Sequence, residues 1–260
     1  HMITNGLFSD DQHGFVPGRS CMTQLLVVME EWTRHLNDGK PVDAIYLDFR
    51  KAFDTVPHQR LLKKLEAYGF KGKLLAWLEQ FLVGRRQRVV IGEEKSDWAV
   101  VSSGIPQGSV LGPLLFVIFI NDMPNELANT CKLFADDAKL YGCINNEESI
   151  ASLQDDLGKL EQWCNKWQMA HNTEKCKSLH LGHNNPRHVY TLNNTPLAQT
   201  AEEKDLGVII DEELKFHPHA SRAVAKGFGL LSVIKKSFAN LDLITLPLIF
   251  TANIRPHLEY

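Results

Sequence analysis

Apolar residues recur at helical spacing in several segments of the chain, and this spacing predicts amphipathic helices. The clearest period lies within residues 147–167, where one face would carry Ile150, Leu153, Leu157, Leu160, Cys164 and Trp167. The same spacing predicts helices at residues 21–36, 57–68 and 73–83, and a last helical region that begins near His217. The nearly continuous apolar stretch at residues 114–120 is typical of a helix inside the core.

Shorter apolar segments predict strands. Residues 42–49 predict a buried strand, and residues 132–134 and 139–142 flank an Ala-Asp-Asp-Ala tetrapeptide, as in a tight hairpin. Residues 88–91 and 98–102 are predicted to pair with each other, and further short strands are predicted at residues 178–181, 189–192 and 206–210. Residues 1–20 predict irregular structure. Because helices of irregular length separate the strands, the predicted fold class is α+β.

The composition is that of an ordinary globular protein. Hydrophobic residues make up 44% and charged residues 23% of the 260 positions, which excludes disorder, collagen-like repetition and coiled coil. The longest apolar run, residues 110–120, is interrupted by Gly112 and Pro113 and is shorter than the ~20 residues of a membrane-spanning helix. We therefore expect no membrane partner. Five cysteines, none in a C-x-x-C pair, predict reduced thiols in an intracellular compartment.

The overall charge argues mildly against a nucleic-acid partner. The formal net charge is −3, whereas nucleic-acid-binding domains are usually basic. Basic residues nevertheless gather locally, and such clusters position a nucleic acid by contacting its phosphates. The clusters are Arg85, Arg86 and Arg88, then Lys63 and Lys64, and last Lys235 and Lys236. The alternative for each cluster is a solvated surface.

Three aspartates follow buried strands. Asp48 comes at the end of the apolar segment 44–47, and Asp136 and Asp137 follow the apolar segment 133–135. If the two strands are neighbours, the carboxylates converge, and like charges ~4 Å apart repel by about 4 kcal/mol at an effective dielectric of ~20. Such a cluster needs protons or cations, and oxygen ligands favour Mg²⁺ or Mn²⁺. The alternative is that Asp136 and Asp137 form a polar turn.

A second constellation suggests zinc. It comprises Cys164, His171, Cys176, His180 and His183, which lie within 20 residues of each other. The spacings C-x₁₁-C and H-x₂-H do not match structural zinc patterns, and Cys164 falls on the apolar face of its predicted helix. We therefore do not favour zinc.

Several segments in order resemble the reverse transcriptases of non-long-terminal-repeat (LINE, jockey-like) retrotransposons. YLDFRKAFDTV at residues 46–56 resembles their motif A, GIPQGSVLGP at 104–113 their motif B, and FADD at 134–137 their motif C. QHGF at 12–15 with PGRS at 17–20 resembles the segment before motif A, and KDLGVIID at 204–211 resembles the primer-grip strands. The likeness covers nearly the whole chain. One motif alone is weak, but four in order are specific.

The resemblance implies a role for each matching residue near the metal. Asp48, Asp136 and Asp137 would bind two metal ions, and the backbone carbonyl of Phe49 would complete one coordination shell. Two such ions activate a primer hydroxyl and stabilise the leaving pyrophosphate. Phe53 would be a steric gate that excludes a ribose 2′-hydroxyl. The alternative is that Phe53 is a core side chain at a strand-to-helix junction.

The resemblance also implies contacts to nucleotide and nucleic acid. Gln107 and Gly108 would line the incoming nucleotide, on a loop where Gly104 and Gly108 bracket Pro106 and let backbone approach a ligand. Lys175 would protonate the pyrophosphate, although Lys177 also fits that position and a solvated lysine is the alternative. Nucleic acid would be held by Arg19, Arg85, Arg86, Arg88, Leu206 and Gly207.

The expected architecture is a right-hand polymerase palm: an antiparallel sheet backed by helices, with partial fingers and the start of a thumb. Residues 1–40 would be partial fingers, 41–215 the palm with inserted fingers elements, and 216–260 a truncated thumb. The expected activity is that of an RNA-directed DNA polymerase, a nucleotidyltransferase that uses Mg²⁺ or Mn²⁺ to extend a DNA primer on an RNA template with deoxynucleotides. Other domains of the retroelement polyprotein would be partners, and a nuclear location is favoured over a cytoplasmic one.

Two alternatives stay open. The family's fingers sequence before residue 12 is missing, so the chain could be a catalytically incomplete nucleic-acid-binding or scaffolding domain derived from a reverse transcriptase. The second alternative is an RNA-templated RNA polymerase, which Phe53 disfavours because its ring would exclude ribonucleotides.

Overall fold

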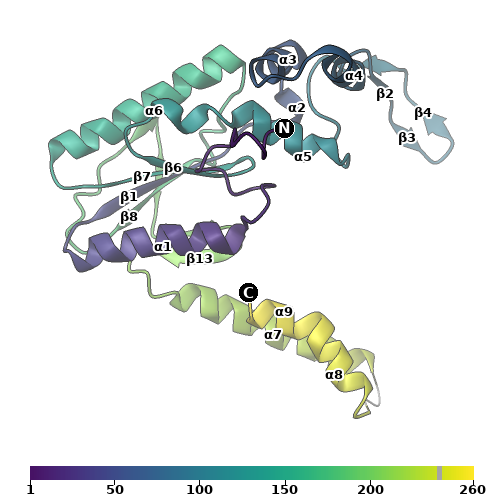
Figure 1. The fold of residues 1–260 in the computed structure, drawn as a ribbon. Helices are drawn as coiled ribbons and strands as arrows, with labels where there is room; N and C mark the ends of the chain where they lie inside the picture. The colour runs from purple at the N-terminus through teal and green to yellow at the C-terminus, as the bar shows by residue number, and fades with distance from the viewer. Residues whose placement is uncertain (239–241) are drawn as a thin grey trace.

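The fold is organised around a five-stranded sheet (Figure 1). The computed structural model describes residues 1–238 and 242–260. The strand order is β11-β8-β1-β7-β6, with bounds Ala198–Thr200, Lys177–Leu181, Val42–Leu47, Asp137–Cys143 and Thr130–Phe134. Neighbours are antiparallel except β11 and β8. The strand that precedes Asp48 therefore lies in the centre of the sheet, directly beside the strand that begins at Asp137.

Helices cover both faces of this sheet because its strands are apolar on both sides. Ile45 and Leu47 belong to the core with α3 (His58–Ala67), α5 (Leu111–Ile120) and α6 (Glu147–Trp167). Val42 and Ala44 pack on the other side, against α1 (Cys21–Asn37) and a hairpin of β12 (Glu202–Asp205) and β13 (Val208–Asp211). Side chains alternate along a strand, so Asp48 belongs to the side of α1 and the hairpin.

Two groups of elements extend from this centre (Figure 1). One contains α2 (Ala52–Thr55), α4 (Gly72–Leu82) and the short strands β2 (Arg86–Gln87), β3 (Val90–Ile91), β4 (Glu94–Lys95) and β5 (Ala99–Val100). The other contains α7 (His217–Ser237), α8 (Thr245–Ile249), η2 (Phe250–Ile254) and α9 (Arg255–Leu258). The remaining elements are η1 (Met123–Glu126), β9 (Thr191–Leu192) and β10 (Thr195–Pro196). Within the described residues, no helix is long and apolar enough to cross a membrane.

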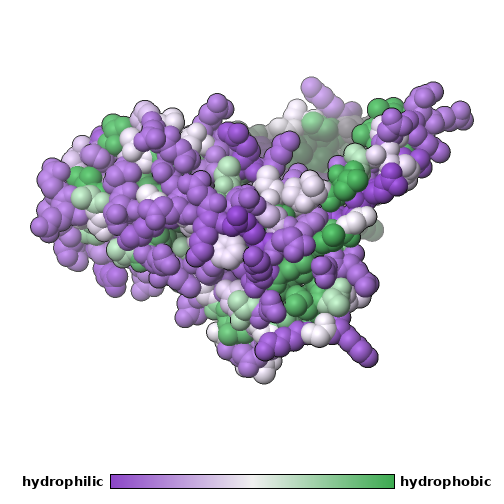
Figure 2. Space-filling view, turned by 90° about the horizontal axis from the view of Figure 1, so that it is seen from above, coloured by the Kyte–Doolittle hydropathy of each residue, from purple (hydrophilic) through white to green (hydrophobic). Residues whose placement is uncertain are grey.

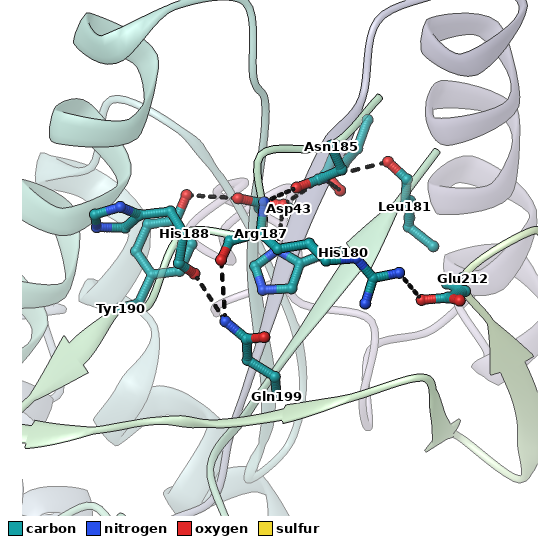
Figure 3. Close-up of polar contacts among 10 residues, drawn as sticks. Asp43, His180, Leu181, Asn185, Arg187, His188, Tyr190, Gln199 and Glu212 are labelled. Carbon is teal, nitrogen blue, oxygen red and sulfur yellow. Dashed lines mark hydrogen bonds and ion pairs between the residues drawn. The ribbon is translucent and has the colours of Figure 1, made fainter. Parts of the chain in front are cut away.

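A buried carboxylate fixes the end of β1 that is remote from Asp48 (Figure 3). Asp43 accepts hydrogen bonds from His180, Asn185 and Tyr190, each with a heavy-atom distance of 2.7 Å. All four lone-pair directions of a carboxylate are available for such bonds, and each charge-assisted bond is worth more than a neutral one. Asp43 therefore ties the segment at 185–190 to the sheet.

The structure confirms most predicted elements and corrects two. The helix at 147–167 and the hairpin around Asp136 form as predicted. The predicted pairing of 88–91 with 98–102 is wrong, because Gly92 turns the chain at φ +61° and β3 pairs with β4 while β2 pairs with β5. The predicted strand at 206–210 is also wrong at its start, because Leu206 and Gly207 have φ of +46° and +96° and form the β12–β13 turn.

Candidate active site

Two of the three predicted aspartates meet at neighbouring strand ends. Leu47 of β1 is the register partner of Ala138 of β7, so the next position on β1, Asp48, lies beside Asp137. Asp136 occupies the two-residue turn before β7, together with Ala135 at φ +51°. The three carboxylates therefore lie at one end of the β1–β7 pair.

The charges at this end interact. Burial raises the pKa of Asp137, and the carboxylates of Asp136, Asp205 and Asp48 raise it further, while the Lys139 ammonium opposes them. Nearby anions disfavour ionisation of a carboxyl group, and a nearby cation favours it. This end of the sheet therefore carries an excess of negative charge that a bound cation would relieve.

A lysine already lies beside Asp48. The Lys175 Nζ is 3.5 Å from the Asp48 Oδ2, and 70% of the Lys175 side chain is exposed. The backbone around Asp48 is held by Asn172, whose N–H donates to the Asp48 carbonyl over 2.7 Å. Lys177, the other candidate, is paired with Glu203 at 2.8 Å. Of the two lysines, Lys175 is therefore the one that lies beside Asp48.

A cavity of about 350 Å³ lies in front of these groups. Its walls come from β1, β7, α1, the segment before β8 and the β12–β13 hairpin. The carboxylates and the predicted primer-grip turn therefore border the same cavity. The lining residues include Tyr46, Asp48, Asp137, Lys139, Lys175, Asp205 and Leu206. Leu206 and Asp48 thus border one cavity, although 158 positions separate them in the chain.

The hairpin turn is also contacted by the C-terminal residue. The Tyr260 hydroxyl donates to the Leu206 carbonyl over 2.6 Å. A Cβ atom on Gly207 would lie 2.4 Å from the Tyr260 ring. Gly207 therefore permits a close contact in addition to its φ of +96°.

The turn at Asp136 is braced by a residue whose role the sequence did not reveal. Gln12 is fully buried, and its Oε1 accepts from the Gly14 and Ala135 N–H groups over 2.7 and 3.0 Å. A Cβ atom on Gly14 would lie 2.4 Å from the Ala135 nitrogen. The QHGF segment thus packs directly on the turn that presents Asp136. The glutamine and glycine of the QHGF segment could have indicated a structural role. The sequence did not show that they contact a turn 123 positions away.

The predicted nucleotide loop is tied to the segment that follows Asp48. The Gly104 N–H donates to the Val56 carbonyl and the Ile105 N–H to the Phe53 carbonyl, each over 2.8 Å. Gly104 has φ +89°, and a Cβ atom there would lie 2.7 Å from the Asp54 carbonyl oxygen. The Gln107 Nε2 donates to the Asp54 Oδ1 over 2.9 Å. The two predicted nucleotide-binding segments therefore form one unit.

Phe53 and Gly108 have different surroundings. The Phe53 ring is half-buried and stacks on Phe116 with centroids 4.4 Å apart. That contact supports the ring from the core side and leaves part of it exposed. Gly108 has φ +80°, and a Cβ atom there would have nothing within 4 Å, so this glycine borders open space. Phe49 is buried and its ring stacks on His171 at 5.0 Å.

The predicted basic residues fall into two groups. The guanidinium groups of Arg19 and Arg85 donate to backbone carbonyls, Arg19 to Ser9 and Gln12 and Arg85 to Leu82 and Gly104. Arg86 and Arg88 are exposed and lie over the Trp98 ring, at 5.9 and 4.5 Å from its centroid. The second group is exposed at the surface, as phosphate contacts require.

Lys64 contradicts the prediction of a basic surface at 63–64. Its Nζ donates to the Phe119 carbonyl and to Asp122, and it lies 3.8 Å from the Trp167 ring centroid. Only 3% of the residue is exposed, and burial lowers its pKa to about 8. Lys64 is therefore part of the core, and its buried ammonium is not available for a phosphate contact.

The residues considered for zinc are divided among separate contacts. The Cys164 Sγ is 3.6 Å from the His171 Nδ1, Cys176 accepts from the Asp48 N–H over 3.3 Å, and His180 is bonded to Asp43. Across residues 1–238 and 242–260, no three His, Cys, Asp or Glu side chains are grouped closely enough to hold a metal ion. A metal at the three aspartates would therefore require side-chain rotation, although carboxylate oxygens are the donors that Mg²⁺ prefers.

Comparisons with known proteins agree with this arrangement. Residues 1–216 match the family described as reverse transcriptase (RNA-dependent DNA polymerase). The "Probable RNA-directed DNA polymerase from transposon X-element" of Drosophila melanogaster is 30% identical over 274 residues, which cover 100% of this chain and 30% of that protein. The RNA-directed DNA polymerase from mobile element jockey of Drosophila funebris is 33% identical over 221 residues, covering 80% and 24% of the two chains.

A solved structure shows the same fold. Telomerase from Candida tropicalis, in complex with a TWJ fragment of telomeric RNA, superposes with a TM-score of 0.55 at 13% identity. The match covers 99% of this chain and 44% of that one. Such a match supports the palm-like arrangement predicted from the sequence.

This chain therefore belongs to the reverse transcriptase family. Its relatives are the RNA-directed DNA polymerases of non-LTR retrotransposons such as jockey and the X-element. The chain spans 30% and 24% of the length of the two relatives described above.

Proposed function

We propose that this domain catalyses RNA-templated DNA synthesis, by transferring deoxynucleotides to the 3′ end of a primer. The observation that carries the proposal is the position of Asp48 beside Asp137 at one end of the β1–β7 pair, on the wall of a cavity that also contains the β12–β13 turn. The cavity is where a primer terminus would lie, because an attacking hydroxyl must reach the carboxylates while its strand rests on the turn.

The reaction replaces the α–β phosphoanhydride bond of the deoxynucleotide by a phosphodiester bond to the primer and releases pyrophosphate. The primer 3′-oxygen attacks the α-phosphorus of the deoxynucleotide, the bond to the β-phosphate oxygen breaks, and the 3′-hydroxyl loses its proton. Mg²⁺ or Mn²⁺ held by Asp48, Asp136, Asp137 and the Phe49 carbonyl would lower the pKa of that hydroxyl and balance the triphosphate charge. Because catalysis of this reaction is mainly positioning and charge stabilisation, these residues need only bind and orient the reacting groups.

Other residues have roles that the geometry supports. Lys175, beside Asp48 and largely exposed, would donate a proton to the departing pyrophosphate. Phe53, held by Phe116, would present the exposed part of its ring to the sugar and exclude a 2′-hydroxyl. Gln107 and Gly108 would line the incoming nucleotide and the template from the loop. Arg86 and Arg88 would contact template phosphates.

Primer extension tests this proposal. The parent, supplied with an RNA template, a DNA primer, deoxynucleotides and Mg²⁺, should extend the primer, whereas an Asp136→Asn/Asp137→Asn double variant should bind the template–primer and not extend it. Ribonucleotides should be poor substrates for the parent, and the Phe53→Val variant should incorporate them faster than the parent does. Extension by the double variant at the parental rate would contradict the proposal.

A second function is favoured by one observation, the lack of a closely grouped metal site in the described residues. In that case the domain would bind template and primer without turnover, as a scaffolding part of a longer protein. Binding that is equally tight with Mg²⁺ and with a chelator, and no extension by the parent, would support this second function.

A further inference from the structure

A buried ion pair adjoins the carboxylates, and the proposed reaction gives it no role. The Lys139 Nζ bonds to the Asp205 Oδ2, and only 4% of each side chain is exposed. Lys139 lies two positions after Asp137 on β7, so both side chains belong to the same side of the sheet. Both Lys139 and Asp205 border the same cavity as Asp48.

The Lys139 ammonium is paired with Asp205, and it also experiences the charge of Asp137, two positions before it on β7. Asp205 and Asp137 both favour its charged form, with Asp205 the stronger of the two, while burial lowers its pKa. Asp137 in turn experiences Lys139 as a favourable cation and Asp205 as an unfavourable anion. Without Asp205, the Lys139 ammonium would still be attracted by Asp137, and it would compete there with any other cation.

Asp205 does not belong to the sheet that holds Asp137. It is the last residue of β12, directly before the Leu206–Gly207 turn, so it moves with the β12–β13 hairpin. A second pair, between Lys177 of β8 and Glu203 of β12, also joins the hairpin to the sheet. The charges that shift the pKa of Asp137 include both members of the first pair, Lys139 and Asp205. The two pairs therefore offer a matched comparison: both fasten the hairpin, and one of them adjoins Asp137.

We propose that Asp205 is a positioning residue for the metal-binding function of Asp137: by holding the Lys139 ammonium, it keeps the Asp137 carboxylate available for a divalent cation. The inference rests on the proposed function, in which Asp137 is a metal ligand. It makes the docking of the β12–β13 hairpin a condition for cation binding at the carboxylates. The primer would then rest on the same hairpin whose Asp205 keeps the Lys139 ammonium away from the Asp137 carboxylate.

Binding of Mn²⁺ without nucleotide, followed by electron paramagnetic resonance, tests this inference with no turnover involved. Asp205→Asn leaves Lys139 free to pair with Asp137 and should weaken Mn²⁺ binding roughly tenfold. The matched control Glu203→Gln breaks the other pair and should change the affinity less than about twofold. Thermal unfolding of each variant verifies that it is folded.

Two further variants distinguish this role from a merely structural one. Asp205→Asn/Lys139→Met removes the competing ammonium, so it should bind Mn²⁺ within about threefold of the parent. Lys139→Met alone should bind Mn²⁺ at least as tightly as the parent, and this result does not depend on the folding of Asp205→Asn. If Asp205→Asn leaves the affinity unchanged, or the double variant is as weak as Asp205→Asn, the inference is wrong. A parent that binds no Mn²⁺ contradicts the proposed metal site itself.

Discussion

At the scale of single residues, Gly104 shows how tightly the nucleotide loop is joined to the segment after Asp48. A Cβ atom there would meet the Asp54 backbone at 2.7 to 3.0 Å, and neither backbone can move alone, since adjacent N–H groups bond across the same junction. The φ of +89° adds a conformational cost for any other residue.

Gly104→Ala should therefore destabilise the domain by about 2–4 kcal/mol, more than the ~1 kcal/mol that a left-handed backbone alone costs an alanine. Gly92→Ala is the matched control, because Gly92 has φ +61° with open space around it. Chemical denaturation of both variants measures the difference. Equal losses of stability would show that the contact with Asp54 does not matter.

Lys64 predicts a pH dependence of stability. Its pKa is about 8 in the folded protein against an ordinary value of 10.5. Between these values the unfolded chain binds more protons than the folded one, so the free energy of unfolding rises with pH. The gain should approach roughly 3 kcal/mol by pH 10.5, because a tenfold change in proton affinity is worth about 1.4 kcal/mol.

The difference between parent and Lys64→Met isolates this contribution from other titrating groups. The parent should gain stability relative to Lys64→Met as the pH rises from 8 to 10.5, in urea denaturation at fixed salt. A difference that is constant over this range would mean that Lys64 keeps its ordinary pKa when folded.

Sequence reasoning at this scale succeeded where chemistry is local. Asp48 and Asp137 were recognisable because a carboxylate after an apolar strand is unusual, and the structure brings them together. Lys64 could not be placed, because the helical pattern does not show that Trp167 and Asp122 would surround its ammonium. The sequence could not show that Lys175 would lie beside Asp48 whereas Lys177 would pair with Glu203, because both contacts join distant parts of the chain.

At the scale of elements, the β6–β7 hairpin depends on the N-terminal segment. Gln12→Met would leave the Gly14 and Ala135 N–H groups buried without an acceptor, and each such group costs about 1–3 kcal/mol. We expect a loss of about 2–4 kcal/mol and a fall in kcat, since the turn carries Asp136. Gln12→Glu keeps the accepting oxygen and should retain more activity than Gln12→Met. Equal activity of these two variants would contradict the role of the Gln12 oxygen in holding the turn.

The arm formed by β2–β5 predicts a salt-dependent contact. Arg86 and Arg88 are exposed beside Trp98, away from the buried core. Arg86→Ala/Arg88→Ala should weaken template–primer binding for all sequences and lower the slope of log affinity against log salt by about 2. Arg34→Ala, an exposed arginine on α1, is the control. An unchanged slope would show that the β2–β5 arm does not contact the nucleic acid.

At the scale of the whole molecule, the fold separates a packed side from a functional side. The α3, α5 and α6 side holds most of the apolar core, whereas the α1 and β12–β13 side holds Asp48, Asp137 and the cavity. The face in Figure 2 is mainly hydrophilic, with hydrophobic side chains gathered in separate areas. The α+β class was predictable from element order. The strand order was not, because the hydrophobic pattern does not state which strands pair.

The same limit explains the errors in the fold prediction. The segment at 206–210 is apolar enough to predict a strand, but only the φ values of Leu206 and Gly207 reveal a turn there. The position of this turn beside the carboxylates follows from the docking of β12 through Lys139 and Lys177. Contacts between such distant positions depend on tertiary packing, which a local sequence pattern does not reveal.

The central claim is that Asp48 and Asp137 form the centre of a polymerase site. Single-turnover primer extension on an RNA template with Mg²⁺ tests it most directly, by comparing the parent with Asp48→Asn. The control is Asp155→Asn, which removes an exposed carboxylate on α6. We expect extension by the parent and by Asp155→Asn. Extension by Asp48→Asn should be at least a thousandfold slower with template–primer binding retained, consistent with a loss of about 4 kcal/mol of transition-state stabilisation. Extension by Asp48→Asn at the parental rate would contradict the central claim.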